Sequence, residues 1–254
     1  MTLILSVETA TRAGSLAILD GERVLWQGTG DNRVSHSAAL LLEVNEGIKR
    51  AGIRLSDVSV FAVATGPGSF TGLRTGLATV MGLAWTLERQ VVGVPTLHAV
   101  ACAEANFGEA IIALLAAGRG ELFAQTLELT SEGEINELDA PTHVSPQKLL
   151  ESERAGRSTL KWAGDGARGH VEEIRARAAR DEITLVDERE GCAASPNRSG
   201  WTLAKASVDV LAVHVAMLGL RAFRRGEVLA ASELRANYVR PSDAELKEQC
   251  REQS

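Results

Sequence analysis

Short apolar runs and helical stripes alternate along the first half of the chain. We expect β-strands over the apolar runs Leu3–Glu8, Gly14–Leu19, Arg23–Gly28, Val58–Ala64 and Val91–Val94. The Asp20-Gly21 pair predicts a hairpin turn between the second and the third of these strands. Apolar residues at helical spacing predict one helix over about His36–Ala51, with Ser35 as its N-cap, and another from Ser69 to Arg89. An antiparallel meander extended by crossover helices is the expected result.

The pattern partly restarts after Asn106. Further strands are expected over Ala110–Leu115, Leu122–Leu129, Lys161–Gly164 and Ile183–Val186. Helices are expected over Val171–Arg180 and Thr202–Arg224, and loops over Ser131–Pro146 and Asp187–Ser199. This order is typical of an α/β protein with the actin-like ATPase (ribonuclease-H-like) fold, built from two related lobes with mixed sheets and flanking helices. We place the lobes at residues 1–104, with the dimerisation helices, and 105–254, with the final helix and the tail.

The segment Phe61–Met81 joins an apolar strand to a helix through a Gly-Pro-Gly turn. A P-loop is excluded, because the segment has no lysine and the wrong glycine spacing. A dinucleotide fingerprint is excluded as well: Gly66 and Gly68 fit, but position 71 is threonine and the third glycine falls at Gly72. Glycines here let the backbone approach an anion, another helix or a partner chain, and the residues alone leave these alternatives open.

The segment Thr65–Ala84 closely resembles the glycine-rich signature of the TsaB (YeaZ) family, bacterial proteins of tRNA threonylcarbamoyladenosine biosynthesis. Other segments resemble the same family in the same order, so that the resemblance spans nearly the whole chain: Leu3–Thr11, Val34–Ser37, Gly118–Phe123 and Tyr238–Leu246. One departure is Ala116-Ala-Gly118, where related chains often carry Asp-Ala-Arg.

The resemblance implies a function as well as a fold. TsaB proteins are non-catalytic paralogues of TsaD, which transfers the threonylcarbamoyl group to N6 of the adenosine next to the anticodon, in tRNAs that read codons beginning with A. The chain is then expected to be a partner subunit of a TsaD-like catalytic subunit, joined by a TsaE-like ATPase. It would have no cofactor or independent activity, and would meet tRNA only through the complex. Family members also pair with themselves, so a homodimer is an alternative.

The two long helices of the first half carry the predicted contact surface. Leu40, Leu41, Val44 and Ile48 form one apolar arc of the first helix, from which Leu42 projects. The second helix has a core stripe comprising Phe70, Leu73, Leu77, Val80, Met81, Ala84 and Leu87. Its opposite side lacks the charges of a solvent face and predicts close helix packing. Either the chain's own first helix or another subunit would satisfy it; the family favours the latter, through Leu42, Gly72, Thr75, Thr79, Gly82 and Thr86.

The ends of predicted strands hold a possible vestigial nucleotide site. Actin-like ATPases carry an acidic residue and a phosphate-binding hairpin where this chain has Glu8 and Thr9, but no glycine precedes Gly14 in the turn. In the second half, Gly164 and Gly166 would permit close approach of a phosphate. A strand end and a plain turn are the simpler interpretations. The alternative function, a small-molecule kinase or ATPase of the same fold, would need both segments to bind nucleotide.

A metal site is a weaker hypothesis. His98 and Cys102 are four residues apart and would share a helix face. TsaD holds its metal through a histidine pair at this spacing, of which the chain keeps only one member. No carboxylate or third histidine shares that helix face, and no nucleophile motif appears. We therefore expect no metal and no catalytic residue, against the alternative of a metallopeptidase that uses His98.

Composition limits the partners. The net charge is −6 and the pI is near 5.5, whereas a protein that grips tRNA by itself normally shows a basic face. The three cysteines, Cys102, Cys192 and Cys250, include no C-x-x-C pair and indicate reduced thiols. No apolar run approaches the length of a membrane helix and no signal sequence is recognisable. A cytoplasmic protein without membrane contact is expected.

Overall fold

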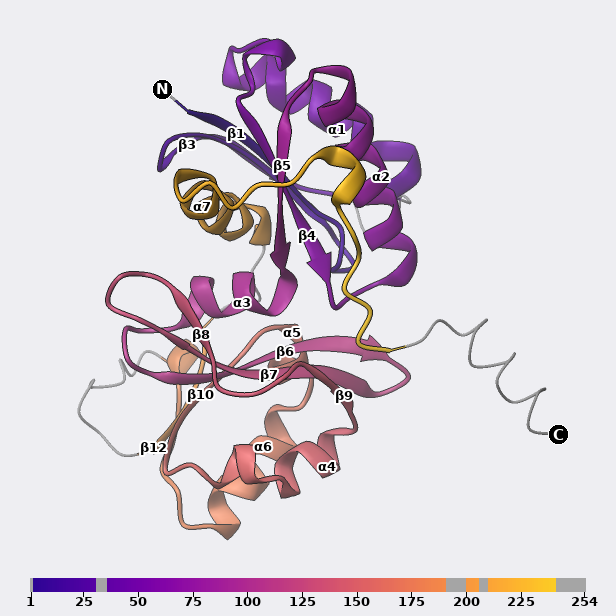
Figure 1. Ribbon diagram of the computed structural model, residues 1–254. Helices are drawn as coiled ribbons and strands as arrows, with labels where there is room; N and C mark the ends of the chain where they lie inside the picture. Colours follow the sequence, from indigo (N-terminus) through magenta and orange to yellow (C-terminus); the bar gives the residue numbers. More distant parts are fainter. Residues whose placement is uncertain (1, 31–35, 191–199, 206–209, 241–254) are drawn as a thin grey trace, which may run out of the picture.

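The computed structural model describes residues 2–30, 36–190, 200–205 and 210–240 and shows a mixed α/β protein with two sheets. Figure 1 shows the sheets one above the other, with helix α3 between them. The first sheet has the order β3-β2-β1-β4-β5, in which β1, β2 and β3 are antiparallel neighbours and β4 and β5 continue parallel to β1. Its strands are β1 Leu3–Glu8, β2 Ser15–Asp20, β3 Arg23–Thr29, β4 Val60–Gly66 and β5 Gln90–Pro95.

The second sheet repeats this plan. Strand β6 pairs antiparallel with β7 and parallel with β10, and the path runs β11-β12-β10-β6-β7-β8, with β9 also paired to β7. The strands are β6 Ala110–Gly118, β7 Glu121–Leu129, β8 Ile135–Glu137, β9 Thr142–Val144, β10 Thr159–Ala163, β11 Leu185–Asp187 and β12 Gly200–Leu203. The shared plan confirms the predicted fold class.

Helices cover both sheets. In Figure 1, α1 and α2 lie on one side of the first sheet and α7 on the other, while α4 and α6 lie beyond the second sheet. The α-helices are α1 His36–Ala51, α2 Phe70–Thr86, α3 Thr96–Glu104, α4 Pro146–Glu151, α5 Asp165–Gly169, α6 Val171–Arg180 and α7 Leu211–Arg224. Short 3₁₀ turns are Leu55–Asp57, Glu153–Gly156, Glu188–Glu190 and Ala231–Glu233.

Strand β6 shows how the core is divided. Successive side chains of a strand point to opposite faces. Ile111 and Ala113 accordingly belong to the large hydrophobic cluster formed by the first sheet, its helices and the residues between the two sheets. Ile112 and Leu114 join the second cluster, beyond the second sheet. There the rings of Trp162 and Trp201 meet edge to face with centroids 5.0 Å apart, a favoured aromatic geometry.

Three sequence expectations need correction. The segment Thr202–Arg224 is not one helix: Thr202 lies in strand β12, parallel to β10, and α7 begins only at Leu211. The expected loop Ser131–Pro146 contains β8 and β9. Its polar composition does not predict strands, but both segments form backbone hydrogen bonds with β7. Leu41 lies outside the apolar arc of α1, on the exposed side. Ser35, the expected cap of α1, falls outside the described residues.

Helix α7 belongs spatially to the first sheet. It packs on β1, β2, β4 and β5, although it follows the second sheet in the chain. Gly219 makes this approach close, since a Cβ there would lie 2.7 Å from the Cβ of Ala62. The division at residues 104 and 105 remains a prediction, and we propose that α7 be counted with the first lobe. The chain therefore returns to the first sheet before its C-terminal segment.

Candidate functional site

The glycine-rich signature builds the junction between β4 and α2. Ser69 caps α2, where its side chain accepts a hydrogen bond from the amide of Gly72 at 3.2 Å. The turn after β1 lies directly against this helix start: the amide of Ser69 donates to the carbonyl of Ala10 at 2.7 Å. A Cβ at Gly68 would lie 2.5 Å from the Cβ of Ala10. The signature glycines therefore permit two backbone segments to pack in direct contact.

Gly72 takes part in the same packing. It is buried, and a Cβ on it would overlap the main-chain oxygen of Thr9. Its carbonyl accepts a hydrogen bond from the Thr9 hydroxyl at 2.8 Å. Gly72 was predicted to face a partner, and this is wrong: it faces the chain's own β1 turn, because residue 72 lies on the flank of α2 rather than on its solvent side.

The outer side of α2 is almost free of charge. Arg74 is the only charged residue between Phe70 and Thr86. The hydroxyls of Thr75 and Thr86 donate to the carbonyls one turn earlier, Thr71 at 3.0 Å and Gly82 at 2.8 Å. These hydroxyls therefore have hydrogen-bond partners within the helix and need none from outside it. Such a surface resembles a protein contact more than a solvated helix face.

Helix α1 packs beside α2 and adds exposed leucines. Leu41 is 61% exposed and Leu42 is 71% exposed, while Trp85 in the last turn of α2 is 73% exposed. We use the name helix-pair face for the following exposed or half-buried residues of these two helices: Leu41, Leu42, Thr75, Ala78, Thr79, Gly82, Trp85 and Thr86. Thr75 and Thr79 are half-buried, so the chain's own packing covers part of the predicted surface. Trp85 was not predicted as part of this surface, although a tryptophan next to the predicted contact residue Thr86 could have indicated it.

The first segment of the vestigial nucleotide site is filled by its own lobe. Glu8 is 1% exposed, and its carboxylate accepts hydrogen bonds from the amide and hydroxyl of Thr11, at 2.7 and 2.8 Å, and from the hydroxyl of Ser15 at 3.2 Å. Burial raises the pKa of Glu8 from its ordinary value, and the hydrogen bonds oppose that rise. The hydroxyl of Thr9 is hydrogen-bonded to the carbonyl of Gly72. Glu8 and Thr9 therefore both stabilise the turn after β1.

The second segment is equally engaged with neighbours. Gly164 has φ of 93° and lies against Leu114, whose carbonyl a Cβ would overlap. A Cβ at Gly166 would lie 2.9 Å from the side chain of Leu122. Asp165 between them accepts a hydrogen bond from the amide of Ala116 at 3.0 Å. Packing against β6 thus accounts for both glycines without a phosphate.

His98 and Cys102 lie on helix α3, as their spacing predicted. Nε2 of His98 lies 2.9 Å from Oε1 of Glu137; burial lowers the pKa of the imidazole, although this carboxylate opposes the change. Burial raises the pKa of the Cys102 thiol, which disfavours the thiolate that metals bind. Within the described ranges, no group of three or more metal-ligating side chains comes together. Cys192 and Cys250 lie outside these ranges.

The C-terminal segment crosses the edge of the first sheet and reaches the start of α2. Leu229 forms an antiparallel bridge with Val91, and the amide of Asn237 donates to the carbonyl of Thr65 at 2.7 Å. The Tyr238 ring then lies 5.1 Å from that of Phe70, between centroids. The sequence resemblance through Leu246 continues beyond the described residues, which end at 240 in this segment.

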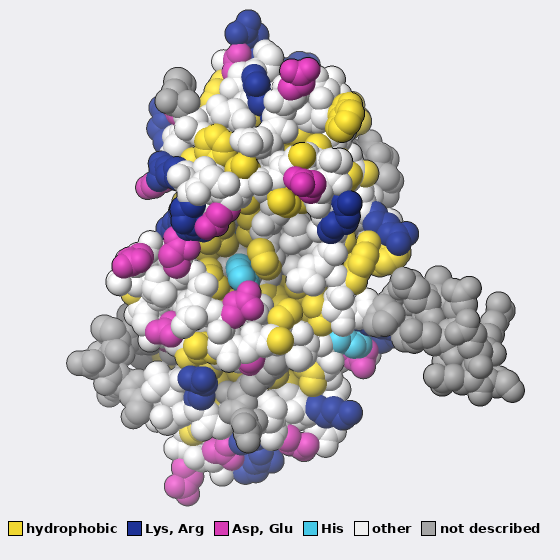
Figure 2. All heavy atoms as spheres, in the orientation of Figure 1, with side chains coloured by type: hydrophobic (Ala, Val, Ile, Leu, Met, Phe, Trp, Pro, Cys, Tyr) yellow, Lys and Arg dark blue, Asp and Glu magenta, His cyan; other side chains and the backbone are white. Residues whose placement is uncertain are grey.

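The surface charge is mixed. Figure 2 shows Lys and Arg side chains scattered among Asp and Glu on the face in view, without a continuous basic area. No helix of the described chain is both long and apolar enough to cross a bilayer.

Comparison with known families and relatives finds proteins of tRNA threonylcarbamoyladenosine biosynthesis. The family model described as "TsaD: tRNA N6-adenosine threonylcarbamoyltransferase" matches residues 32–180, more than half of the chain. The TsaB protein of Escherichia coli (strain K12) is 33% identical over 128 residues, 47% of this chain and 52% of that protein. That of Bacillus subtilis (strain 168) is 28% identical over 120 residues, 47% and 52%. The chain belongs to the TsaB (YeaZ) family.

Solved structures extend the likeness beyond the matched half. YeaZ from Pseudomonas aeruginosa is 26% identical and superposes with a TM-score of 0.69, covering 94% of this chain and 100% of that one. A ROK hexokinase from Thermus thermophilus, 13% identical with a TM-score of 0.50 over 89% of this chain and 100% of that one, shares the fold alone. In sequence, the chain spans about half the length of the curated TsaB relatives it matches.

Proposed function

We propose that the chain is the non-catalytic partner of a TsaD-like catalytic subunit in forming N6-threonylcarbamoyladenosine next to the anticodon. The observation that supports this role is the outer side of α2, a helix of 17 residues whose single charge is Arg74. A solvated helix face normally carries several charges. Together with the exposed leucines of α1, the helix-pair face has the composition of a docking surface.

The kinase alternative has less support. Glu8, Thr9, Gly164 and Gly166 each make contacts within the protein that account for their identity. A phosphate-binding turn would instead present free amides toward a cleft. In the proposed complex, this TsaB chain contributes architecture, and nucleotide and tRNA are bound by other subunits. A TsaE-like ATPase would join the complex, which would assemble in the cytoplasm; self-association through the same face is the competing assembly.

The deciding experiment is threonylcarbamoyl transfer to tRNA by a purified TsaD-like subunit and TsaE-like ATPase, with and without this chain. Product is expected only when the chain is present. A chain with Thr79 replaced by Glu, or with the exposed neighbour Ala78 replaced by Glu, is expected not to stimulate transfer, because docking would bury an ionised carboxylate without a partner.

Ala176 provides a matched control. It is also an exposed alanine within a helix, α6 of the second half, so Ala176→Glu makes the same chemical change far from the helix-pair face. This variant should stimulate transfer like the wild type. Equal transfer without the chain would refute the partner role, and equal inhibition by Ala78→Glu and Ala176→Glu would refute the assignment of the surface.

A further inference from the structure

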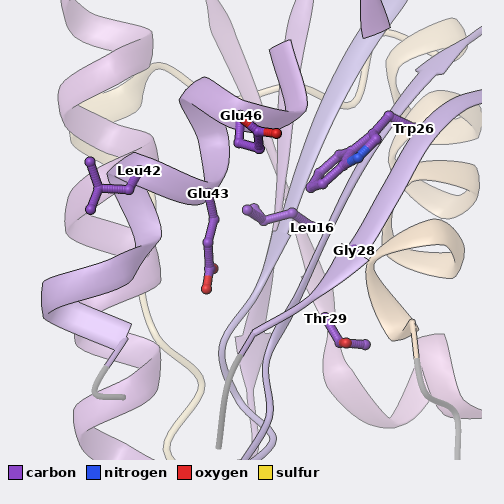
Figure 3. A pocket seen from close by; sticks show the side chains of 7 residues that line it. All are labelled: Leu16, Trp26, Gly28, Thr29, Leu42, Glu43 and Glu46. Atoms are coloured by element: carbon purple, nitrogen blue, oxygen red, sulfur yellow. The ribbon is translucent and has the colours of Figure 1, made fainter. Parts of the chain in front are cut away.

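A pocket of about 280 Å³ lies between α1 and the β2–β3 side of the first sheet. The sheet lines it with Leu16, Trp26, Gly28 and Thr29. Figure 3 shows the Trp26 indole and the Leu16 side chain projecting from the strands toward α1. The pocket therefore has an aromatic and aliphatic wall, a feature of sites that bind an organic group rather than a hydrated ion.

Two glycines determine where the indole lies. A Cβ at Gly28, on the same strand, would lie 2.8 Å from the indole ring, and one at Gly47, on α1, would lie 2.6 Å from it. The ring consequently bridges strand and helix by resting against bare backbone on each. A side chain at either position would displace the indole and change the pocket.

Helix α1 gives the pocket its charge. Glu43 and Glu46 line it from the helix, and both reach away from α1 in Figure 3. Glu46 is paired with Arg50 one turn later, at 2.7 Å on the surface, whereas Glu43 forms no ion pair with any residue of the described chain. Carboxylates beside an indole disfavour an anion and favour a cation, which also gains from the aromatic face.

The pocket is continuous with the helix-pair face. Leu42 lines it and is also among the most exposed apolar residues of the protein. In Figure 3, Leu42 lies on the side of α1 away from Trp26. A protein that covers Leu42 would thus have part of its own surface at the rim of the pocket.

We propose that this pocket receives an arginine side chain from the protein that docks on the helix-pair face. This inference rests on the proposed function and adds the chemistry of the partner's contact. An arginine has an apolar stem for Leu16, a flat guanidinium that stacks on an indole, and donors for carboxylates. The volume lies at the lower limit of typical ligand pockets, about 300 Å³, and suits one side chain better than a nucleotide.

The first test measures the affinity of the purified TsaD-like subunit for three forms of the chain by calorimetry. These are the wild type, a pocket variant with Glu43→Gln and Glu46→Gln, and a control with Glu132→Gln and Glu172→Gln. The control residues are exposed, belong to the second half of the chain and give the same change of net charge. The pocket variant is expected to bind roughly tenfold more weakly, because both carboxylates that would pair with the guanidinium lose their charge while the indole of Trp26 stays in place.

The outcomes separate the two proposals. If the wild type and both variants bind equally, the pocket proposal is overturned while the docking role stands. If the wild type does not bind, both fall. Weaker self-association of the pocket variant without weaker partner binding would assign the pocket to a second copy of the chain, against the proposal. Arg33 precedes α1 in the sequence, and an identical loss in Arg33→Ala would assign the pocket to this residue of the chain itself, against the proposal.

A second test identifies the arginine by charge exchange. Glu43→Arg in this chain is expected to weaken the complex, and a scan of Arg→Glu variants on the partner's surface should yield one that restores binding. Restoration by a single position supports the proposal, and restoration by none overturns it. Trp26→Leu, which removes the indole face and keeps an apolar wall, is expected to weaken the wild-type complex only when the partner retains that arginine.

Discussion

The hydroxyl of Thr9 donates a hydrogen bond to the main-chain carbonyl of Gly72, 2.8 Å away, and the main-chain oxygen of Thr9 occupies the place that a Cβ on residue 72 would take. The turn after strand β1 and helix α2 are thereby joined at the segment that the sequence suggested as part of a possible vestigial nucleotide site. The glycine at position 72 is required by this internal contact.

Gly72→Ala should therefore destabilise the protein. Alanine favours a helix over glycine by about 1 kcal/mol, but here its methyl group overlaps backbone that cannot move as a flexible side chain would. Overpacking of this kind typically costs 1–3 kcal/mol or more, so we expect a net loss of about 2 kcal/mol. Urea denaturation followed by tryptophan fluorescence measures it.

Gly82→Ala is the matched control. Gly82 lies in the same helix, is exposed, and has nothing within 4 Å of the position of a Cβ. The substitution should stabilise the protein by about 0.5–1 kcal/mol, the helix propensity alone. If both variants changed stability in the same direction, the contact with Thr9 would not be what selects glycine at position 72.

Nucleotide should leave the stability of the isolated chain unchanged. A ligand at a hundred times its Kd raises the unfolding free energy by about 2.7 kcal/mol, which a thermal melt detects easily. Because Glu8 is held by Thr11 and Ser15, we expect no shift of the melting temperature with ATP and Mg²⁺. A saturable rise that MgCl₂ alone does not produce would restore the kinase hypothesis.

Many helices and strands of the fold could be predicted from the sequence, because the apolar pattern of each segment matches the side that the fold buries. Strand β1 and helix α6 have the predicted bounds, Leu3–Glu8 and Val171–Arg180. Strands β8 and β9 could not be predicted, since their polar residues become strands only by pairing with β7. The place of α7 on the first sheet depends on tertiary packing across the whole chain, which no local pattern encodes.

The site was predictable in part for a similar reason. Helical spacing correctly put Gly82 and Thr86 on the outer side of α2 and Leu42 off the core arc of α1. It could not assign Gly72, because whether a flanking glycine meets solvent or another segment depends on the turn after β1. The Trp26 pocket was equally hidden, since its walls come from a strand and a helix that meet only in the folded protein.

Tyr238 is expected to fix the C-terminal segment to α2. Its ring packs on Phe70, and its hydroxyl accepts a hydrogen bond from Nε of Arg74 at 3.2 Å on the surface. Tyr238→Phe keeps the ring contact and should cost only a few tenths of a kcal/mol, whereas Tyr238→Ala should cost about 1 kcal/mol. Chemical denaturation compares the two; equal losses would mean that the hydroxyl, rather than the ring, holds the segment.

Glu8 should make stability depend on pH in a direction that can be stated in advance. Burial raises the pKa of its carboxyl group in the folded protein above the ordinary value of 4.5. Ionisation therefore costs folding free energy at every pH above the folded pKa, and the cost disappears as pH falls below the pKa of the unfolded chain. Glu8→Gln removes this titration and retains much of the hydrogen bonding to Thr11 and Ser15.

The difference in unfolding free energy between wild type and Glu8→Gln, measured by urea denaturation from pH 8 to pH 4, isolates this effect. The wild type should gain stability relative to the variant as pH falls, because its folded form binds a proton more readily than its unfolded form. The exposed-site variant Glu132→Gln should run parallel to the wild type. An opposite slope, with the wild type losing stability first, would mean that the hydrogen bonds from Thr11 and Ser15 outweigh burial and that Glu8 is ionised in the folded protein.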